Sequence, residues 1–200
     1  MMTKKYVTTE KVALTYYSSE IDPRKRTIVF FHGLSADHRL FRDQVAYFKD
    51  DYNIITWDAP GHGDSKDAPS YELDVAAQAI EAILDKEGVT KAILVGQSFG
   101  GYHAQSFMLR YPERVEAFIG IGTSPYGNYY SKLDFFLLRK ASAMVSGLDY
   151  RSLKEQVAKS VSLTTEGQKL MLEMLENLSH EEYAHLLQEN YDAFIRDNRE

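Results

Sequence analysis

The 200-residue sequence contains no cysteine. This absence excludes disulfide bonds, metal sites built on thiolates and a cysteine nucleophile. The fold must therefore be stabilised by packing alone. A chain of this length can bury a large core, as one domain or as one domain with a sizeable insertion.

Basic residues are also in the minority, with 23 Lys and Arg against 29 Asp and Glu. Because nucleic-acid binding needs clustered positive charge, we expect no nucleic-acid partner. No apolar stretch approaches the ~20 residues of a membrane span, and no apolar run follows Lys4 and Lys5 as in a signal peptide. We therefore expect a cytoplasmic protein with no membrane association.

The sequence does contain a regular alternation of apolar strands and amphipathic helices. Residues 11–17 alternate like a half-buried strand, whereas the other predicted strands are apolar throughout, as in a parallel sheet covered on both faces. The order predicts an α/β fold with a doubly wound, mostly parallel sheet. The apolar strands are predicted at 27–31, 52–57, 92–95 and 115–122. The helices are predicted at 37–48, from a cap at Ser70 to Gly88, and at 102–111.

The pattern changes after Pro125, where no further strand is predicted. Helical spacing indicates about four helices, at 130–145, at 152–161, after a cap at Thr164, and after a capping box formed by Ser179 and Glu182. We therefore divide the chain into an α/β core, residues 1–124, and a helical cap segment, residues 125–200. Five aromatic residues of the cap segment either line a pocket or pack among the helices: Tyr126, Tyr129, Tyr130, Phe135 and Phe136.

The stretch Gly96-Gln97-Ser98-Phe99-Gly100-Gly101 joins a predicted strand to a predicted helix. The chain must reverse there within four or five residues, with Ser98 at the apex and glycines that let strand and helix approach closely. This is the pattern of a nucleophile elbow. Ligands of doubly wound sheets bind beyond the carboxyl ends of the strands, where His32-Gly33-Leu34 and residues 58–65 are also expected.

Three motifs in this order resemble the alpha/beta-hydrolase superfamily over roughly residues 10–125: His32-Gly33, Asp58-Ala59-Pro60-Gly61-His62-Gly63-Asp64-Ser65, and Gly96 to Gly101. The segment after Pro125 resembles the helical cap of that family. The resemblance implies that Ser98 is the nucleophile and that the backbone N–H groups of Leu34 and Phe99 form the oxyanion hole. It also implies supporting roles for the motif residues, and no metal or organic cofactor. These supporting residues are His32, Gly33, Gly96, Gln97 and Gly100.

The chemistry agrees with these implied roles, because acyl transfer builds negative charge on an oxygen that fixed N–H donors stabilise. The resemblance implies hydrolysis of a carboxylic ester or a similar small acyl substrate through a Ser98 acyl-enzyme. Serine at this position argues against dehalogenase and epoxide hydrolase chemistry, which use a carboxylate nucleophile in this fold. Thioester, lactone, amide and carbon–carbon bond hydrolysis remain open, because pockets differ within one fold.

Several histidines have plainer explanations than catalysis. His32 is expected to brace the oxyanion loop through hydrogen bonds, and His62, like Asp58, to shape the rim. His103 is expected to be a packing or surface residue. His180 and His185 are expected on a solvated face of the last helix.

The family's mechanism also needs an acid and a histidine that follow the serine in the chain. Here Thr123-Ser124 occupy the end of the sixth family strand, where some members place the acid, and no histidine follows a strand after Ser98. Two explanations remain open: part of a longer hydrolase, which we favour, or a binding protein that has lost catalysis. The strand from Val115 to Gly122 would be an exposed apolar edge, which soluble proteins normally avoid, and this supports the longer hydrolase. In a binding protein, the same edge could pair with another copy of the chain. Under either, we expect negligible turnover, since loss of the base costs on the order of 10⁶ in rate.

Overall fold

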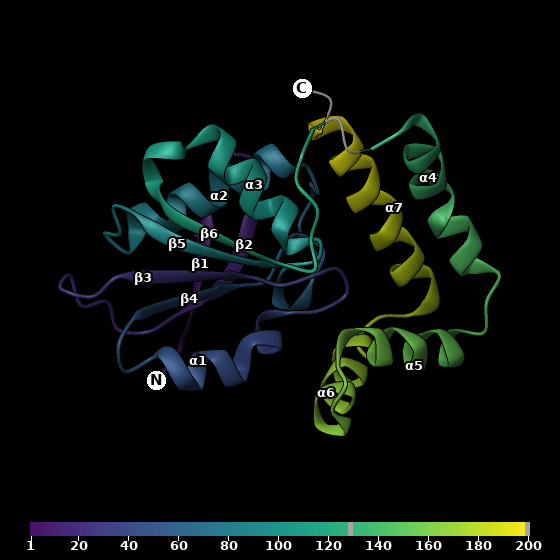
Figure 1. Cartoon of the computed structure of the whole chain (residues 1–200), viewed down its shortest axis with the longest axis horizontal. Coiled ribbons are helices and arrows are strands. Elements are labelled where there is room, and N and C mark those ends of the chain that lie inside the picture. Colours follow the sequence, from purple (N-terminus) through teal and green to yellow (C-terminus); the bar gives the residue numbers. More distant parts are fainter. Residues whose placement is uncertain (128–129, 199–200) are drawn as a thin grey trace.

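The computed structural model describes residues 1–127 and 130–198. A six-stranded sheet with the order β1-β2-β4-β3-β5-β6 forms its centre (Figure 1). β3, β4, β5 and β6 run parallel, whereas β1 and β2 join one side of the sheet antiparallel. The predicted fold class, a doubly wound and mostly parallel α/β sheet, is confirmed. The strands are Thr3–Thr8 (β1), Ala13–Ser18 (β2), Thr27–Phe31 (β3), Asn53–Trp57 (β4), Ala92–Gln97 (β5) and Val115–Ile121 (β6).

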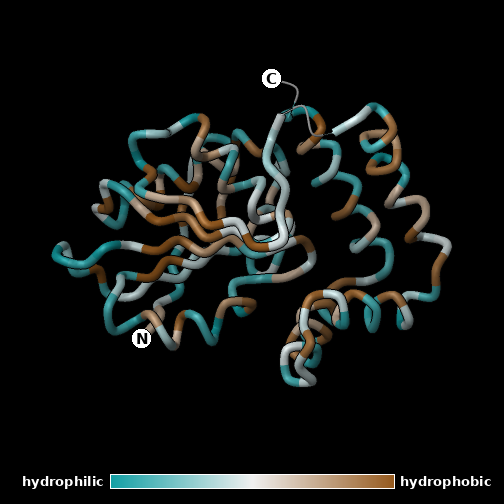
Figure 2. Tube along the Cα trace, viewed as in Figure 1, coloured by the Kyte–Doolittle hydropathy of each residue, from teal (hydrophilic) through white to brown (hydrophobic). Residues whose placement is uncertain are grey.

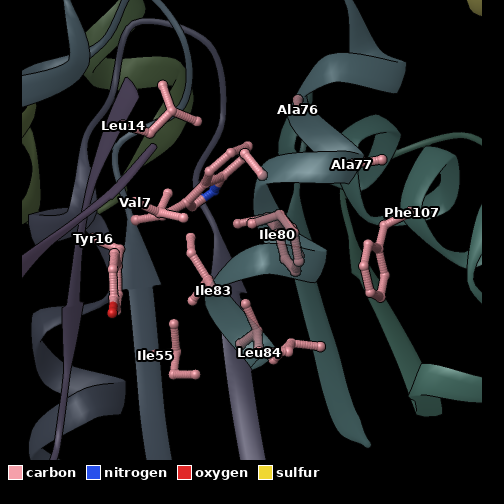
Figure 3. Packing of buried hydrophobic residues seen from close by; sticks show 14 of the residues in the cluster. Val7, Leu14, Tyr16, Ile55, Ala76, Ala77, Ile80, Ile83, Leu84 and Phe107 are labelled. Atoms are coloured by element: carbon pink, nitrogen blue, oxygen red, sulfur yellow. The ribbon is translucent and has the colours of Figure 1, made fainter. Parts of the chain in front are cut away.

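The central strands are mostly apolar, as expected where helices cover both faces of a sheet. On one face, Val29 and Phe31 of β3 pack in a cluster with side chains of α2 (Leu73–Lys86) and α3 (Gly100–Arg110). On the other face, Ile28 and Phe30 pack in a cluster with side chains of α1 (Arg42–Phe48). Figure 2 shows apolar residues along the central strands, and Figure 3 shows α2 side chains directed into the core.

The sequence prediction missed β1, which lies antiparallel along β2. Only Val7 of its six residues is buried, and its lysines are typical of a protected sheet edge. The Lys5 ammonium binds the Glu87 carboxylate at 2.8 Å, far away in the sequence. The apolar pattern of β1 is therefore too weak to be recognised locally.

Several predicted helix boundaries differ from the structure, three of them in the α/β part of the chain. Ser70 does not cap α2, because its hydroxyl accepts from the Glu72 N–H at 3.3 Å and the helix begins at Leu73. The predicted helix 37–48 is divided, because the Asp37 side chain caps a short 3-10 turn, His38–Phe41, before α1 begins. The third boundary is the start predicted at residue 102, because α3 begins two residues earlier and spans Gly100–Arg110.

Four helices follow β6: α4 (Lys132–Ser146), α5 (Tyr150–Val161), α6 (Thr165–Leu175) and α7 (His180–Asp197). The predicted cap at Thr164 and the capping box of Ser179 and Glu182 are confirmed. α7 runs beside α4 and also contacts α2 (Figure 1). Near the end of α7, Phe194 packs in a cluster with Phe99 and Leu73. The division between core and cap at residue 124 remains a prediction. Among residues 1–127 and 130–198, no helix combines the length and apolar composition that crossing a bilayer requires.

β6 forms the edge of the sheet opposite β1 and pairs with β5 alone. Ile119 and Ile121 are 51% and 46% exposed, so the edge is apolar and open, as predicted. Its one charged residue, Glu116, binds Arg26 at 2.6 Å. A cavity of about 290 Å³ lined mainly by apolar side chains lies beside Ile119 and Ile121.

We predict that this edge supports self-association of the 200-residue chain, because open apolar edges pair with other strands. Ile119→Lys should shift the chain from dimer toward monomer in sedimentation velocity. Leu163→Lys is the control, because Leu163 is 99% exposed in the loop between α5 and α6. A monomeric wild-type chain, or a dimer unchanged by Ile119→Lys, would contradict the prediction.

Candidate active site

Ser98 occupies a strained turn between β5 and α3. Its φ is +51°, a conformation that non-glycine residues rarely adopt and that persists where the surroundings impose it. The Ser98 N–H donates to the Ile121 carbonyl at 2.9 Å, which ties the turn to β6. The side-chain hydroxyl makes no hydrogen bond with any of the described residues. The turn therefore presents a serine oxygen with no internal partner.

Glycines allow the strand and the helix to come this close. A Cβ on Gly96 would lie 2.6 Å from the Gly101 Cα, and one on Gly100 would lie 2.5 Å from the His32 carbonyl oxygen. Neither position has room for a side chain. The predicted close approach of the strand and helix of the elbow is what Gly96 shows, whereas Gly100 instead lies against the end of β3 and the start of the following loop.

The loop after β3 lies beside this turn. The His32 Nε2 accepts from the Ala59 N–H at 3.0 Å, so the ring proton is on Nδ1, which donates to the Gly33 carbonyl at 2.8 Å. Ser35 also has a positive φ, +67°. A Cβ on Gly33 would lie 3.2 Å from the Gln97 carbonyl oxygen. These contacts fix the path of the loop, as the bracing role expected for His32 requires.

Two backbone donors beside Ser98 are free. In the described part of the chain, the N–H groups of Leu34 and Phe99 have no hydrogen-bond acceptor. Both residues line a cavity of about 180 Å³ together with Ser98. The Phe99 N–H also lies at the N-terminus of α3, where the helix dipole favours negative charge. The serine and the two residues with free N–H donors therefore line one small cavity.

Aromatic side chains form most of the remaining wall. Tyr130 lines the cavity, as one of the two predicted possibilities requires. Phe135 stacks on Tyr130 and Tyr126 packs against Tyr102, whereas Phe136 is 55% exposed; Tyr129 lies outside the described residues. The sequence prediction missed four lining residues: Tyr102, Leu138, Tyr191 and Phe194. Tyr191 and Phe194 share one face of a helix, and this spacing is the one signal that could have indicated them.

The structure describes all six histidines, and none bonds to Ser98. His38 binds the Asp58 carboxylate at 2.9 Å, and His185 lies 4.0 Å from Glu189 on an exposed face. The solvated position predicted for His180 is wrong, because its ring stacks on Tyr150 and its Nε2 donates to the Val145 carbonyl at 2.9 Å. The other three, His32, His62 and His103, are buried.

Burial is the main cause of the lowered pKa of each of these three histidines. It lowers the pKa of His62 to about 3, and that of His103 well below its ordinary value. The His62 Nδ1 donates to the Pro60 carbonyl at 2.9 Å, which leaves its Nε2 as an acceptor without a partner in the described chain. Both ring nitrogens of His103 likewise have none, and its ring packs against Trp57 and Phe99. His103 is thus a packing residue, one of the two predicted possibilities.

Asp37, His38 and Asp58 bring three possible metal-ligand atoms within 4.8 Å of one another. The carboxylate oxygens of this group already have partners. Asp37 binds Arg39 at 2.6 Å, and Asp58 accepts from the backbone N–H groups of His38 and Asp64. Burial of Asp58 acts to raise its pKa. The hydrogen bonds from His38 act in the opposite direction, and the pKa of Asp58 lies below its usual value. This group is better explained as a hydrogen-bonded brace between two loops than as a metal centre.

A model of the alpha/beta hydrolase fold matches residues 26–178 of the chain. A 2-hydroxy-6-oxononadienedioate/2-hydroxy-6-oxononatrienedioate hydrolase from Paraburkholderia phymatum is 33% identical over 128 residues, which cover 60% of this chain and 44% of that protein. A 3-oxoadipate enol-lactonase 2 from Acinetobacter baylyi is 30% identical over 122 residues, which cover 60% of this chain and 45% of that protein. The chain thus spans less than half the length of either relative.

Solved structures show the same fold. A hydrolase from Pseudomonas aeruginosa superposes with a TM-score of 0.74 at 17% sequence identity, covering 94% of this chain and 72% of that one. At this identity the likeness concerns the fold alone.

Proposed function

The chain belongs to the alpha/beta hydrolase fold family, and from this premise we propose that it is a serine hydrolase of a carboxylic ester or a similar small acyl compound. The proposed nucleophile is Ser98, and the proposed oxyanion hole consists of the N–H groups of Leu34 and Phe99. The observation that carries the proposal is the common cavity lined by Ser98 and by Leu34 and Phe99, whose backbone N–H groups have no acceptor in the described chain.

In the proposed reaction, the Ser98 Oγ attacks the carbonyl carbon and its proton passes to a general base. The alcohol leaves with a proton, and water then releases the acid from the acyl-enzyme. The two N–H groups stabilise the negative oxygen of each tetrahedral intermediate. One such donor contributes about 10² to 10³ in rate.

The described residues supply no base to Ser98, because each of the six histidines is held elsewhere. Loss of the base in a serine hydrolase costs on the order of 10⁶ in rate. We therefore propose that the 200-residue chain on its own turns over esters negligibly. The same observation favours the alternative that the chain is a non-catalytic binding protein of this fold.

The type of bond is inferred from the serine and from the relatives. A serine nucleophile forms an ester with the acyl group, which suits acyl substrates in general. The relative from Acinetobacter baylyi is named an enol-lactonase, and a lactone is a cyclic ester. These points support an ester over other acyl compounds without identifying the compound itself.

A serine-directed fluorophosphonate probe tests the proposal on the 200-residue chain, with imidazole added as the missing base. The Ser98 Oγ should form a bond to phosphorus as fluoride leaves and the proton passes to imidazole. We expect peptide mass spectrometry to locate the label on Ser98, at a rate that rises with imidazole concentration. Without imidazole, hydrolysis of p-nitrophenyl acetate should be no faster than for Ser98→Ala.

The matched control is Ser146→Ala, which changes an exposed serine of α4 and should label like the wild-type chain. Equal labelling of the wild-type chain and Ser98→Ala would contradict the nucleophile and favour the binding protein. Rapid hydrolysis without imidazole that is abolished in Ser98→Ala would contradict the proposed inactivity of the chain.

A further inference from the structure

We propose that the cavity beside Ser98 accepts an uncharged, compact acyl group and rejects an acyl group that carries a carboxylate. This inference rests on the proposed function, because it concerns the part of the substrate that Ser98 would acylate. The proposed function gives the type of reaction, and the present proposal gives the chemical class of the acyl group that reacts.

The lining of the cavity contains no charged side chain in residues 1–127 and 130–198. Apart from Ser98, its wall consists of aromatic and leucine side chains, among them Leu34, Leu138 and Phe194. A carboxylate placed there loses its hydration without gaining a cation, which strongly disfavours binding. The two free N–H groups do not compensate, because in the acyl-enzyme geometry the carbonyl oxygen of the substrate occupies them.

Arg110, which reaches Asp197 and through it Tyr126, does not supply a cation to the cavity. Arg110 binds Asp197 at 2.5 Å, and the Tyr126 hydroxyl donates to the same carboxylate at 2.9 Å. Arg110 is thus neutralised by a partner that is itself buried. Neither Arg110 nor Asp197 is among the residues that line the cavity, whereas Phe194, whose ring packs against Tyr126, is.

The tyrosine hydroxyls at the cavity are neutral hydrogen-bonding groups. Burial raises the pKa of Tyr102 and of Tyr191, so neither becomes a phenolate near neutral pH. The hydroxyls of Tyr102 and Tyr130 bond to each other, whereas that of Tyr191 has no partner among the described residues. The Tyr191 hydroxyl can therefore donate to a neutral acceptor such as a ketone or ether oxygen.

The size of the cavity limits the acyl group further. Its volume of about 180 Å³ is below the ~300 Å³ at which pockets for drug-sized ligands begin. A short chain with one neutral polar group fits these dimensions, whereas a long fatty acyl chain does not.

Two boronic acids of nearly equal shape test the inference, because boron bonds only to a correctly placed serine. The neutral probe is 4-oxopentylboronic acid, and the anionic probe is 3-carboxypropylboronic acid, whose carboxylate is ionised at about pH 8. In each case the Ser98 Oγ bonds to trigonal boron, a proton passes to water, and a tetrahedral boronate anion forms. Boron-11 NMR measures this adduct, and Ser98→Ala is the blank.

We expect the neutral probe to form the Ser98 adduct with at least a tenfold lower dissociation constant than the anionic probe. Leu138→Arg places a cation in the wall from α4 and should shift the ratio at least tenfold toward the anionic probe. Adducts of equal affinity in the wild-type chain would overturn the inference and leave the proposed nucleophile intact. Absence of a Ser98-dependent adduct with both probes would instead contradict the proposed function and, with it, the inference.

Discussion

Gly100→Ala is expected to lower the free energy of unfolding by at least about 3 kcal/mol. The new Cβ would overlap the carbonyl oxygens of Phe31 and His32, at the end of the central strand β3. These are backbone atoms, so no rotation of a side chain can relieve the overlap. Relief would require α3 to move away from the sheet, which would disrupt the turn that holds Ser98.

Gly147→Ala is the matched control, because Gly147 has a φ of −90° and its Cβ would lie 3.7 Å from the nearest atom. Alanine should be neutral there or stabilise by up to about 1 kcal/mol, since it restricts the unfolded chain. Thermal unfolding followed by circular dichroism should show a drop in Tm on the order of 10 °C for Gly100→Ala alone. Equal Tm values for the two variants would show that the helix can shift freely at the elbow.

The parts of the fold that were predicted correctly have local causes. β3, β4 and β5 were recognised because both faces of each strand are covered, which makes nearly every residue apolar. β1 was missed because it is held by distant partners, such as Glu87 for Lys5, which no local pattern encodes. The helix start at Ser70 was wrong because the type of a capping residue alone does not fix the position at which a helix begins.

The candidate site divides in the same way. The elbow was predicted because the strand, the glycines and the helix lie within one short stretch around Ser98. Most of the cavity wall was not predicted, because Leu138 and Tyr191 reach the cavity from α4 and α7. The positions of these two residues depend on how the helices after β6 fold back. The burial of His62 and His103 also follows from tertiary packing, and nothing in their immediate sequence indicates it.

The second large effect concerns acid, because three buried histidines are neutral in the folded chain. Burial lowers the pKa of His32, His62 and His103, whereas an unfolded histidine titrates near 6.5. Below that pH the unfolded chain binds more protons than the folded chain, so the free energy of unfolding falls as pH falls. Each histidine that stays neutral in the folded chain below that pH adds up to about 1.4 kcal/mol per pH unit to the slope.

His62 alone illustrates the size of the effect. Its folded pKa is about 3, so between pH 6.5 and pH 5 its contribution falls by about 2 kcal/mol. The other two histidines act in the same direction. Asp58, whose folded pKa is also lowered, adds a loss only near and below pH 4, where the unfolded carboxyl is protonated. Urea denaturation at pH 8, 6.5 and 5 should therefore show a marked loss of stability as the pH falls.

His103→Leu separates the histidines from a general effect of acid. The His103 ring makes no hydrogen bond with the described residues, so leucine removes a buried polar group without orphaning a partner. The variant should be at least as stable as the wild-type chain at pH 8, and its slope below pH 6.5 should be smaller by about 1.4 kcal/mol per pH unit. His185→Leu removes an exposed imidazole and serves as the control. If His103→Leu and the wild-type chain lose stability in parallel, protonation of the buried His103 is not a cause of the acid sensitivity.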